Sequence, residues 1–288
     1  MEQTIQALFD PMSSPRGFAP KRQFSQNFLT DVGIARNIVN QLNIVRGDCV
    51  LEVGPGKGAL TKLLLETEAL AVHAVDVDQR ALDYLAHQEW ASGPGLVCSL
   101  RDALTVDMAD SFPDAVRSHR KIIGNIPYSI TSELLFWAFS QYCNVSRVVF
   151  MMQREVAKRC AAQPGTKDYG ILSVASWLYS EPKIAFHVQP GSFFPRPEVT
   201  SSVITFSMRQ RLPMNLPDGL FMEFVRGAFS QRRKVMSNAL GAWSGRHNIP
   251  VRREAASIDL TRTRAEELQP ERLASVFLEL MQDGRNSA

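Results

Sequence analysis

Residues 49–61 read CVLEVGPGKGALT, an apolar run that passes into a glycine-rich turn. The run over 49–53 predicts a buried central strand, and the turn predicts the start of a helix that continues to about Glu66. Glycine lets a backbone turn sharply and approach a ligand closely, so Gly54-x-Gly56-x-Gly58 at this place indicates a nucleotide-type loop. A turn made only for tight packing is the alternative.

Alternating strands and helices surround this stretch. Apolar runs predict further strands at 71–75, 96–98, 121–124, 147–151, 183–188 and 202–207, and amphipathic patterns predict helices at 31–42, 79–88, 132–140, 153–162 and 169–178. The alternation argues for a parallel α/β sheet with crossover connections. A linker is expected at 212–217, followed by helical spacing from Phe221 and again from Leu268, where Pro270 either opens or interrupts the last helix.

Composition indicates an ordinary soluble globular protein. Of the 288 residues, 45% are hydrophobic and 21% are charged, and no segment has the length and apolarity of a membrane span. The four cysteines are far apart and lack metal-ligand spacing, which favours reduced thiols in a cytosolic, metal-free protein. From Arg209 onward there are 13 Lys/Arg against 9 Asp/Glu, and before it 19 against 20. The positive excess therefore lies in the C-terminal part, as either a solvated surface or a site for an anionic partner.

Acidic residues follow two of the predicted strands. Asp76 lies 22 residues after Gly54, a distance at which a carboxylate accepts hydrogen bonds from ribose hydroxyls. Asp78 competes for this role. Asp102 follows the next strand and can accept from an adenine amine, although a helix N-cap is an equally good interpretation. The tight glycine spacing suits S-adenosylmethionine better than a dinucleotide, because no pyrophosphate has to be cradled.

A second motif, Gly124-Asn125-Ile126-Pro127-Tyr128-Ser129, follows the strand expected at 121–124. Ligands bind at the carboxyl ends of strands in open α/β sheets. Pro127 restrains the backbone, so that the carbonyls of Asn125 and Ile126 can face one amine while the Tyr128 ring lies against a flat base. A simple strand-to-helix turn is the alternative.

Two more segments carry candidate contacts to nucleic acid. The loop FFPRPEV, residues 193–199, offers two rings, of which we expect one to be exposed for base stacking and the other to be core. The run QRRK, residues 231–234, is expected on a helix, where Arg233 and Lys234 face solvent and phosphate. Arg232 instead is placed to tie the two parts of the chain together.

With these motifs together, the chain resembles the ribosomal small-subunit RNA adenine dimethyltransferases, from about Lys21 to about Leu280. The resemblance rests on six landmarks in order: QNFL at 26–29, LEVGPGKG at 51–58, Asp102-Ala103, GNIPY at 124–128, FxPxPxV at 193–199 and RAEEL at 264–268. The last landmark favours these enzymes over the related 23S rRNA methylases.

The resemblance implies a Rossmann-like class I methyltransferase sheet over 21–209 and a small all-helical domain over 210–288, after a flexible leader over 1–20. It implies transfer of methyl groups from S-adenosylmethionine to N6 of two adjacent adenines near the 3′ end of 16S rRNA, within an immature 30S subunit, by a cytoplasmic monomer with no membrane partner. The family usually has Glu at the ribose position, where this chain has Asp76.

The resemblance also assigns residues. It places Asn27, Leu29, Gly54, Asp76, Asp102 and Asn125 at the cofactor, and Asn125, Tyr128 and Phe193 at the target adenine, with a ring on each side of the base. A DNA adenine methyltransferase, whose motif commonly has Pro where this chain has Ile126, and a non-catalytic assembly factor are the competing hypotheses.

Overall fold

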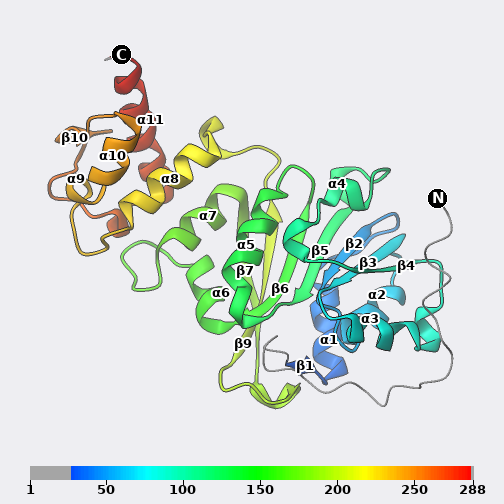
Figure 1. The fold of residues 1–288 in the computed structure, drawn as a ribbon. Helices are drawn as coiled ribbons and strands as arrows, with labels where there is room; N and C mark the ends of the chain where they lie inside the picture. Colours follow the sequence, from blue (N-terminus) through cyan, green and yellow to red (C-terminus); the bar gives the residue numbers. More distant parts are fainter. Residues whose placement is uncertain (1–26, 287–288) are drawn as a thin grey trace.

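The computed structural model describes residues 27–286, so the leader expected over 1–20 lies outside the described residues. A seven-stranded sheet of order β4-β3-β2-β5-β6-β9-β7 forms the centre of the molecule (Figure 1). Its strands are β2 (Cys49–Val53), β3 (Ala71–Asp76), β4 (Leu96–Leu100), β5 (Arg120–Asn125), β6 (Arg147–Gln153), β7 (Ser180–Val188) and β9 (Ser201–Met208).

The last part of the sheet differs from the parallel arrangement expected from the sequence. β2 to β6 pair in parallel, but β9 runs antiparallel to both β6 and β7. The physical reason is the connection between β7 and β9, which is a loop without a crossover helix of the kind that parallel neighbours require. The chain therefore reverses as a hairpin at this edge.

Helices cover both faces of the sheet, because successive side chains of a strand point to opposite faces. One apolar cluster joins Val50 and Val149 of the sheet to helices α1 (Val32–Asn40) and α2 (Ala59–Leu65). The other face packs against α5 (Thr131–Ser140), α6 (Arg154–Cys160) and α7 (Ile171–Tyr179). Two short helices, α3 (Gln79–Ala86) and α4 (Met108–Ser111), lie in the connections that follow β3 and β4. The central strands are buried on both sides, as their continuous apolar runs indicate.

The C-terminal part contains α8 (Asp218–Ala228), α9 (Met236–Ala239), α10 (Gly241–His247) and α11 (Pro270–Asn286). Pro270 thus opens the last helix. A small antiparallel pair of strands, β10 (Glu254–Ala255) and β11 (Ile258–Asp259), makes this part mainly rather than entirely helical. Its rings pack edge-to-face, for example Phe221 on Phe277 at 5.5 Å, and share one apolar cluster with α5 and α7.

The basic run at 231–234 is not helical, contrary to the sequence prediction. Helix α8 ends at Ala228, and the backbone N–H of Lys234 donates to the carbonyl of Gln231 at 2.8 Å in a turn. This segment has to redirect the chain between α8 and α9, which a continued helix would prevent.

A short two-stranded sheet brings the N-terminal segment to the loop before β9. β1 (Phe28–Leu29) pairs antiparallel with β8 (Phe193–Phe194), with Phe28 opposite Phe194 and Leu29 opposite Phe193. The backbone N–H and the hydroxyl of Thr30 extend this pairing by donating to the carbonyl of Ser192 at 2.9 and 3.0 Å.

Among the described residues, no helix combines the length and apolar composition that crossing a membrane requires.

Candidate active site

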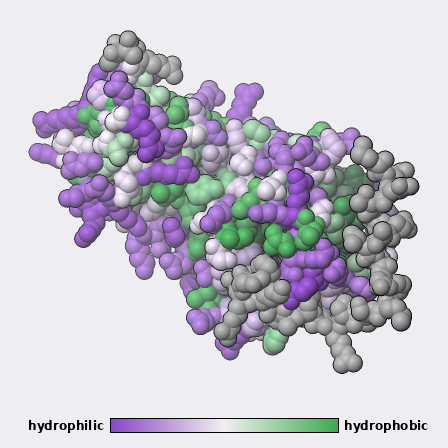
Figure 2. Space-filling view, in the orientation of Figure 1, coloured by the Kyte–Doolittle hydropathy of each residue, from purple (hydrophilic) through white to green (hydrophobic). Residues whose placement is uncertain are grey.

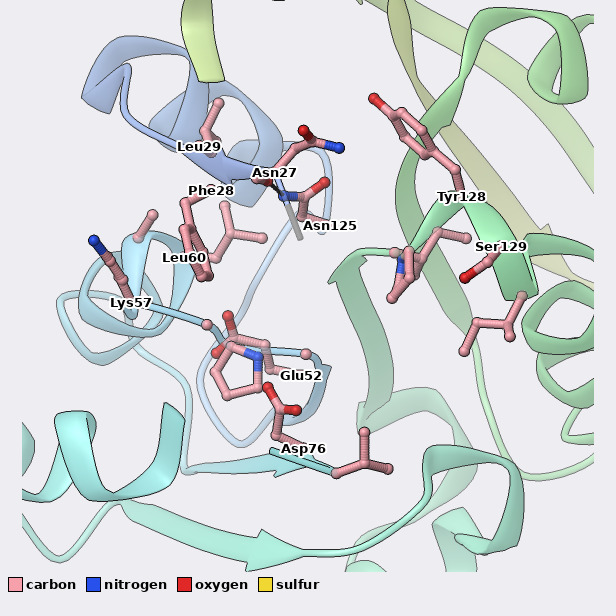
Figure 3. A pocket seen from close by; sticks show the side chains of 18 of the residues that line it. Asn27, Phe28, Leu29, Glu52, Lys57, Leu60, Asp76, Asn125, Tyr128 and Ser129 are labelled. Atoms are coloured by element: carbon pink, nitrogen blue, oxygen red, sulfur yellow. Dashed lines mark hydrogen bonds between the residues drawn. The ribbon is translucent and has the colours of Figure 1, made fainter. Parts of the chain in front are cut away.

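A cavity of about 330 Å³ opens at the carboxyl ends of β2, β3 and β5 (Figure 3). Its wall contains seven of the predicted site residues, which are Asn27, Leu29, Gly54, Asp76, Asp102, Asn125 and Tyr128. These residues come from five separate segments of the chain, four of which follow parallel strands that all end at the same edge of the sheet. The volume is in the range of small-molecule pockets.

The glycine-rich turn forms one side of the cavity in a conformation that its glycines permit. Gly54, Gly56 and Gly58 have φ values of 68°, 55° and 76°, in the left-handed region that other residues rarely adopt. A Cβ at Gly58 would come within 2.6 Å of Leu85 and Trp90, and one at Gly56 within 3.1 Å of the Phe28 ring. Packing therefore requires glycine at positions 56 and 58, while the ligand-binding interpretation stays a prediction that this packing does not exclude.

Asp76, and not Asp78, is the acid that reaches the cavity. Oδ1 of Asp76 accepts from the backbone N–H of Asp78 at 2.9 Å, and burial raises the pKa of its carboxyl. The Asp78 carboxylate caps α3 and forms an ion pair with Arg80, outside the residues that line the cavity. Of the two candidates for a ribose contact, Asp76 is therefore the one that lines the cavity.

The N-cap interpretation of Asp102 is confirmed, and its contact with the cofactor's adenine stays a prediction. Its Oδ1 accepts from the backbone N–H of Leu104 at 2.9 Å and caps a single 3-10 turn, Ala103–Thr105. The residue is also exposed and lines the cavity.

Asn125 ends β5 with its side chain held in a defined orientation. Its Nδ2 donates to the backbone carbonyl of Asn27 at 2.9 Å. This contact uses one of the two amide hydrogens and fixes the orientation of the amide, so we expect the carbonyl oxygen to be the end that accepts from a ligand. The backbone N–H of the next residue, Ile126, donates to Met151 at 3.1 Å, which draws the motif onto the neighbouring strand. Figure 3 shows Asn27 and Asn125 close together at the cavity.

Tyr128 is fixed by a residue that the sequence analysis did not single out. Its hydroxyl lies 2.6 Å from the hydroxyl of Ser201, a fully buried residue at the start of β9. Burial raises the pKa of the Tyr128 hydroxyl, which keeps it protonated. Because Ser201 lies 73 positions after Tyr128, no local sequence pattern could predict this contact.

The two rings of the 193–199 loop divide as expected into one buried and one exposed ring, but Phe193, the ring predicted to stack on the base, is the buried one. Phe193 is 5% exposed and packs in the apolar cluster with Leu29, whereas Phe194 is 62% exposed. Phe193 does not line the cavity. The ring predicted for base stacking is therefore a core residue in this structure, because pairing with β1 turns Phe193 inward.

Glu52 is a pocket residue that the sequence analysis quoted only as part of a motif. It is 1% exposed at the end of β2 and lines the cavity, and its Oε2 has no hydrogen-bond partner among residues 27–286. Burial raises the pKa of its carboxyl to about 7. An acid in the middle of an otherwise apolar strand-and-loop stretch is the signal that could have drawn attention to it.

The basic run lies away from this cavity, on the C-terminal part, where Figure 2 shows mostly hydrophilic side chains at the surface. Arg232 donates to the carbonyl oxygens of Thr166 and Tyr169 at 3.2 and 2.9 Å and pairs with Glu266 at 2.8 Å. This confirms that Arg232 joins the two parts of the chain. Arg233 and Lys234 are exposed, as predicted.

Residues 27–286 contain no cluster of three His, Cys, Asp or Glu arranged for a metal ion.

The sheet and the pocket at its carboxyl edge are those of a Rossmann-like methyltransferase. The chain belongs to the ribosomal RNA adenine dimethylase family, whose model matches residues 17–282. It is thus an rRNA adenine dimethyltransferase, an enzyme class that takes its methyl groups from S-adenosylmethionine. The family predicted from the six sequence landmarks is confirmed.

Similar proteins agree with this assignment. The ribosomal RNA small subunit methyltransferase A of Moorella thermoacetica is 36% identical over 270 residues, covering 91% of this chain and 92% of the relative. The protein of the same name from Prosthecochloris aestuarii is 40% identical over 222 residues, covering 77% and 82%. Two solved structures share the fold at 24% identity. One is a dimethyladenosine transferase from Plasmodium falciparum, with a TM-score of 0.73; the match covers 89% of this chain and 98% of that one. The other is the 23S rRNA methyltransferase ErmE, with a TM-score of 0.65; the match covers 89% of this chain and 100% of that one.

Proposed function

We propose that this enzyme dimethylates N6 of two adjacent adenines near the 3′ end of 16S rRNA, in an immature 30S subunit. The observation that carries the proposal is the orientation of Asn125, whose amide nitrogen is bound to Asn27 at 2.9 Å at the edge of the cavity. Its carbonyl oxygen is thereby presented to an incoming amine. Relatives at 36–40% identity are named for the small ribosomal subunit, which supports this substrate over 23S rRNA.

The residues present fit S-adenosylmethionine. The left-handed glycines leave the backbone open to close approach, acids stand at the ends of β3 and β4, and a buried carboxyl oxygen in the pocket wall lacks a partner among the described residues. The residues proposed to hold the cofactor are Asn27, Leu29, Gly54, Asp76, Asp102 and Asn125. When bound, this cofactor supplies an electrophilic methyl group on a positively charged sulfur.

The protein's chemical contribution is to prepare the adenine amine. The lone pair of N6 is delocalised into the ring, so this nitrogen is a poor nucleophile. The carbonyls of Asn125 and Ile126 would accept its two hydrogens, which draws the nitrogen toward tetrahedral geometry and favours the positive charge that develops on it. This interaction is stronger in the transition state than in the ground state and therefore accelerates the reaction.

The base has to be unpaired and turned out of its stack to reach this pocket. Tyr128 supplies one ring to hold it. No dedicated base is required in this scheme, since the methylated nitrogen is acidic and gives up a proton readily. We propose that the enzyme acts as a cytoplasmic monomer on the assembling subunit.

The test is methyl transfer from labelled S-adenosylmethionine to immature 30S particles, naked 16S rRNA and DNA. We expect dimethyladenine in the particles alone, and its loss in Asn125→Ala with RNA binding nearly intact. Asn40→Ala, which removes an exposed amide on α1, is the matched control and should leave turnover unchanged. Labelled DNA, or a normal single-turnover rate in Asn125→Ala, would overturn the proposal.

A further inference from the structure

Phe194 is an exposed aromatic residue beside the active site to which the proposed chemistry gives no role. Its side chain is 62% exposed, and it belongs to none of the apolar clusters of the described residues. A single exposed apolar side chain is ordinary on a protein surface. The position of this ring and the charges around it therefore have to carry the argument.

The pairing of β1 with β8 fixes the face on which the Phe194 ring lies. Directly opposite residues of an antiparallel pair point to the same side of the sheet. Leu29 and its partner Phe193 both lie in the buried apolar cluster, so Phe28 and its partner Phe194 share the other face. Phe28 lines the cavity, as Figure 3 shows. Phe194 is thus one strand away from the cavity wall, on the face of Phe28, without being part of that wall.

Positive charges accompany the ring. The backbone N–H of Arg154 donates to the carbonyl of Thr200 at 3.0 Å, which brings the start of α6 to the end of the loop that carries Phe194. Four exposed cations and two exposed acids lie on α6 and on residues 193–200; they are Arg154, Lys158, Arg159 and Arg196, with Glu155 and Glu198. An aromatic ring beside an excess of cations is the combination that binds single-stranded nucleic acid.

We propose that Phe194 stacks on the nucleotide that flanks the target adenine, and that the cations of its loop and of α6 bind phosphates on that side. The inference rests on the proposed function, in that it takes the cavity to receive the target adenine. A base turned out of its stack into the cavity leaves its neighbour in the strand outside. The two target adenines are adjacent, so in one of the two rounds the base on Phe194 is the other adenine.

Substitutions of the ring test the stacking. Phe194→Ala should weaken binding to immature 30S particles by about 5- to 150-fold, the effect of losing one base–aromatic stack. Phe194→Trp should bind like the parent, whereas Phe194→Leu, which is apolar but not flat, should be as weak as the alanine variant. Affinity for S-adenosylmethionine should stay unchanged, because the ring lies outside the cavity wall. Val116→Ala is the matched control, since Val116 is also 62% exposed but precedes β5.

A salt titration separates the ring from the charges near it. An uncharged ring releases no counterion, so Phe194→Ala should lower the affinity by the same factor at every salt concentration. Arg196→Ala should instead flatten the salt dependence by about one unit of slope. A flatter slope in Phe194→Ala, or full affinity in Phe194→Leu, would overturn the stacking.

The base that meets Phe194 is found by changing the RNA as well. Particles are reconstituted with 16S rRNA in which one or the other of the two adenines is an abasic nucleotide, which leaves one target and removes the base beside it. With one of these two particles, the parent should bind as weakly as Phe194→Ala binds the intact particle, and Phe194→Ala should lose nothing further. Additive losses with both particles would overturn the inference.

The two proposals fail in different measurements. The cycle is measured as binding, so it decides the role of Phe194 whether or not a methyl group is transferred. Absence of methyl transfer from the parent to intact particles would instead overturn the proposed function.

Discussion

Two acids, Asp76 and Asp78, lie two positions apart at the end of β3, and their surroundings give them different tasks. Asp78 forms an ion pair with Arg80 and caps the first turn of α3. Asp76 is buried enough for its pKa to be raised, yet it faces the cavity. We therefore expect ribose binding to depend on Asp76, although its side chain is shorter than that of the Glu usual in the family.

We predict that Asp76→Ala weakens S-adenosylmethionine binding by about 10- to 100-fold, because hydrogen bonds to a charged group are lost. Asp76→Glu should retain or improve the affinity, since it restores the family's usual acid. Titration calorimetry measures both variants, and Asp83→Ala, an exposed acid on α3, is the control. Unchanged affinity in Asp76→Ala would mean that the ribose contact is made elsewhere.

Strand β9 connects the edge hairpin to the active site. Ser201 is its first residue, and its hydroxyl holds the hydroxyl of Tyr128 at 2.6 Å across a separation of 73 residues. The Tyr128 ring, which we propose holds the target base, is thus positioned by the sheet and not only by its own short turn.

Ser201→Ala should therefore slow single-turnover methyl transfer by about 2- to 10-fold, the effect of one hydrogen bond, with cofactor affinity unchanged. Tyr128→Phe should give a similar loss, and the double variant should be no slower than either single one, because both remove the same contact. Ser207→Ala, exposed on the same strand, controls for effects on β9. Fully additive losses in the double variant would show that the hydrogen bond does not act through Tyr128.

The pairing of β8 with β1 decides which phenylalanine is core. Phe193 fills the cluster beside Leu29, and Phe194 stands in solvent opposite Phe28. We predict that Phe193→Ala lowers the free energy of unfolding by about 3 kcal/mol, whereas Phe194→Ala changes it by less than about 0.5 kcal/mol.

Denaturant unfolding of the two variants measures this difference. Each serves as the control for the other, because the two rings are adjacent in sequence and differ in burial. Equal stability losses would mean that the two rings share the core in solution.

The molecule as a whole joins a catalytic sheet to a basic C-terminal part through a continuous apolar core and a polar clamp. Arg232 contributes to the clamp through the carbonyls of Thr166 and Tyr169, which leaves Arg233 and Lys234 exposed beside it. The turn that replaces the expected helix still places these two side chains at the surface. The boundary expected at 209 and 210 stays a prediction, because the apolar cluster runs across it.

Arg233→Ala combined with Lys234→Ala should weaken binding to the small subunit and flatten its salt dependence by about one to two units of slope, since each lost phosphate contact releases one counterion fewer. Cofactor affinity should stay unchanged. Binding measured across a salt titration tests this, with Arg246→Ala plus Arg252→Ala as a double variant of equal charge elsewhere on the same part. Parent-like binding at every salt concentration would exclude this run as the RNA contact.

The local sequence was sufficient to predict the strands, the glycine-rich loop and the position of Asn125 at the end of a strand. Strands buried on both faces appear as continuous apolar runs, and the carboxyl ends of parallel strands converge, so the segments that follow the strands predicted to end at 53, 75, 98 and 124 were expected to meet. The family motifs then supplied most of the wall of the cavity.

Contacts between distant segments decided the remainder. The antiparallel direction of β9, the inward turn of Phe193, the Ser201–Tyr128 pair and the unpaired oxygen of Glu52 each depend on segments that lie far apart in the chain. Periodicity describes one element at a time, whereas burial and hydrogen-bond satisfaction are properties of the assembled core. For that reason the acid at position 52 could be read as part of a motif, but its missing partner became visible only once β2, β3 and α2 had closed around it.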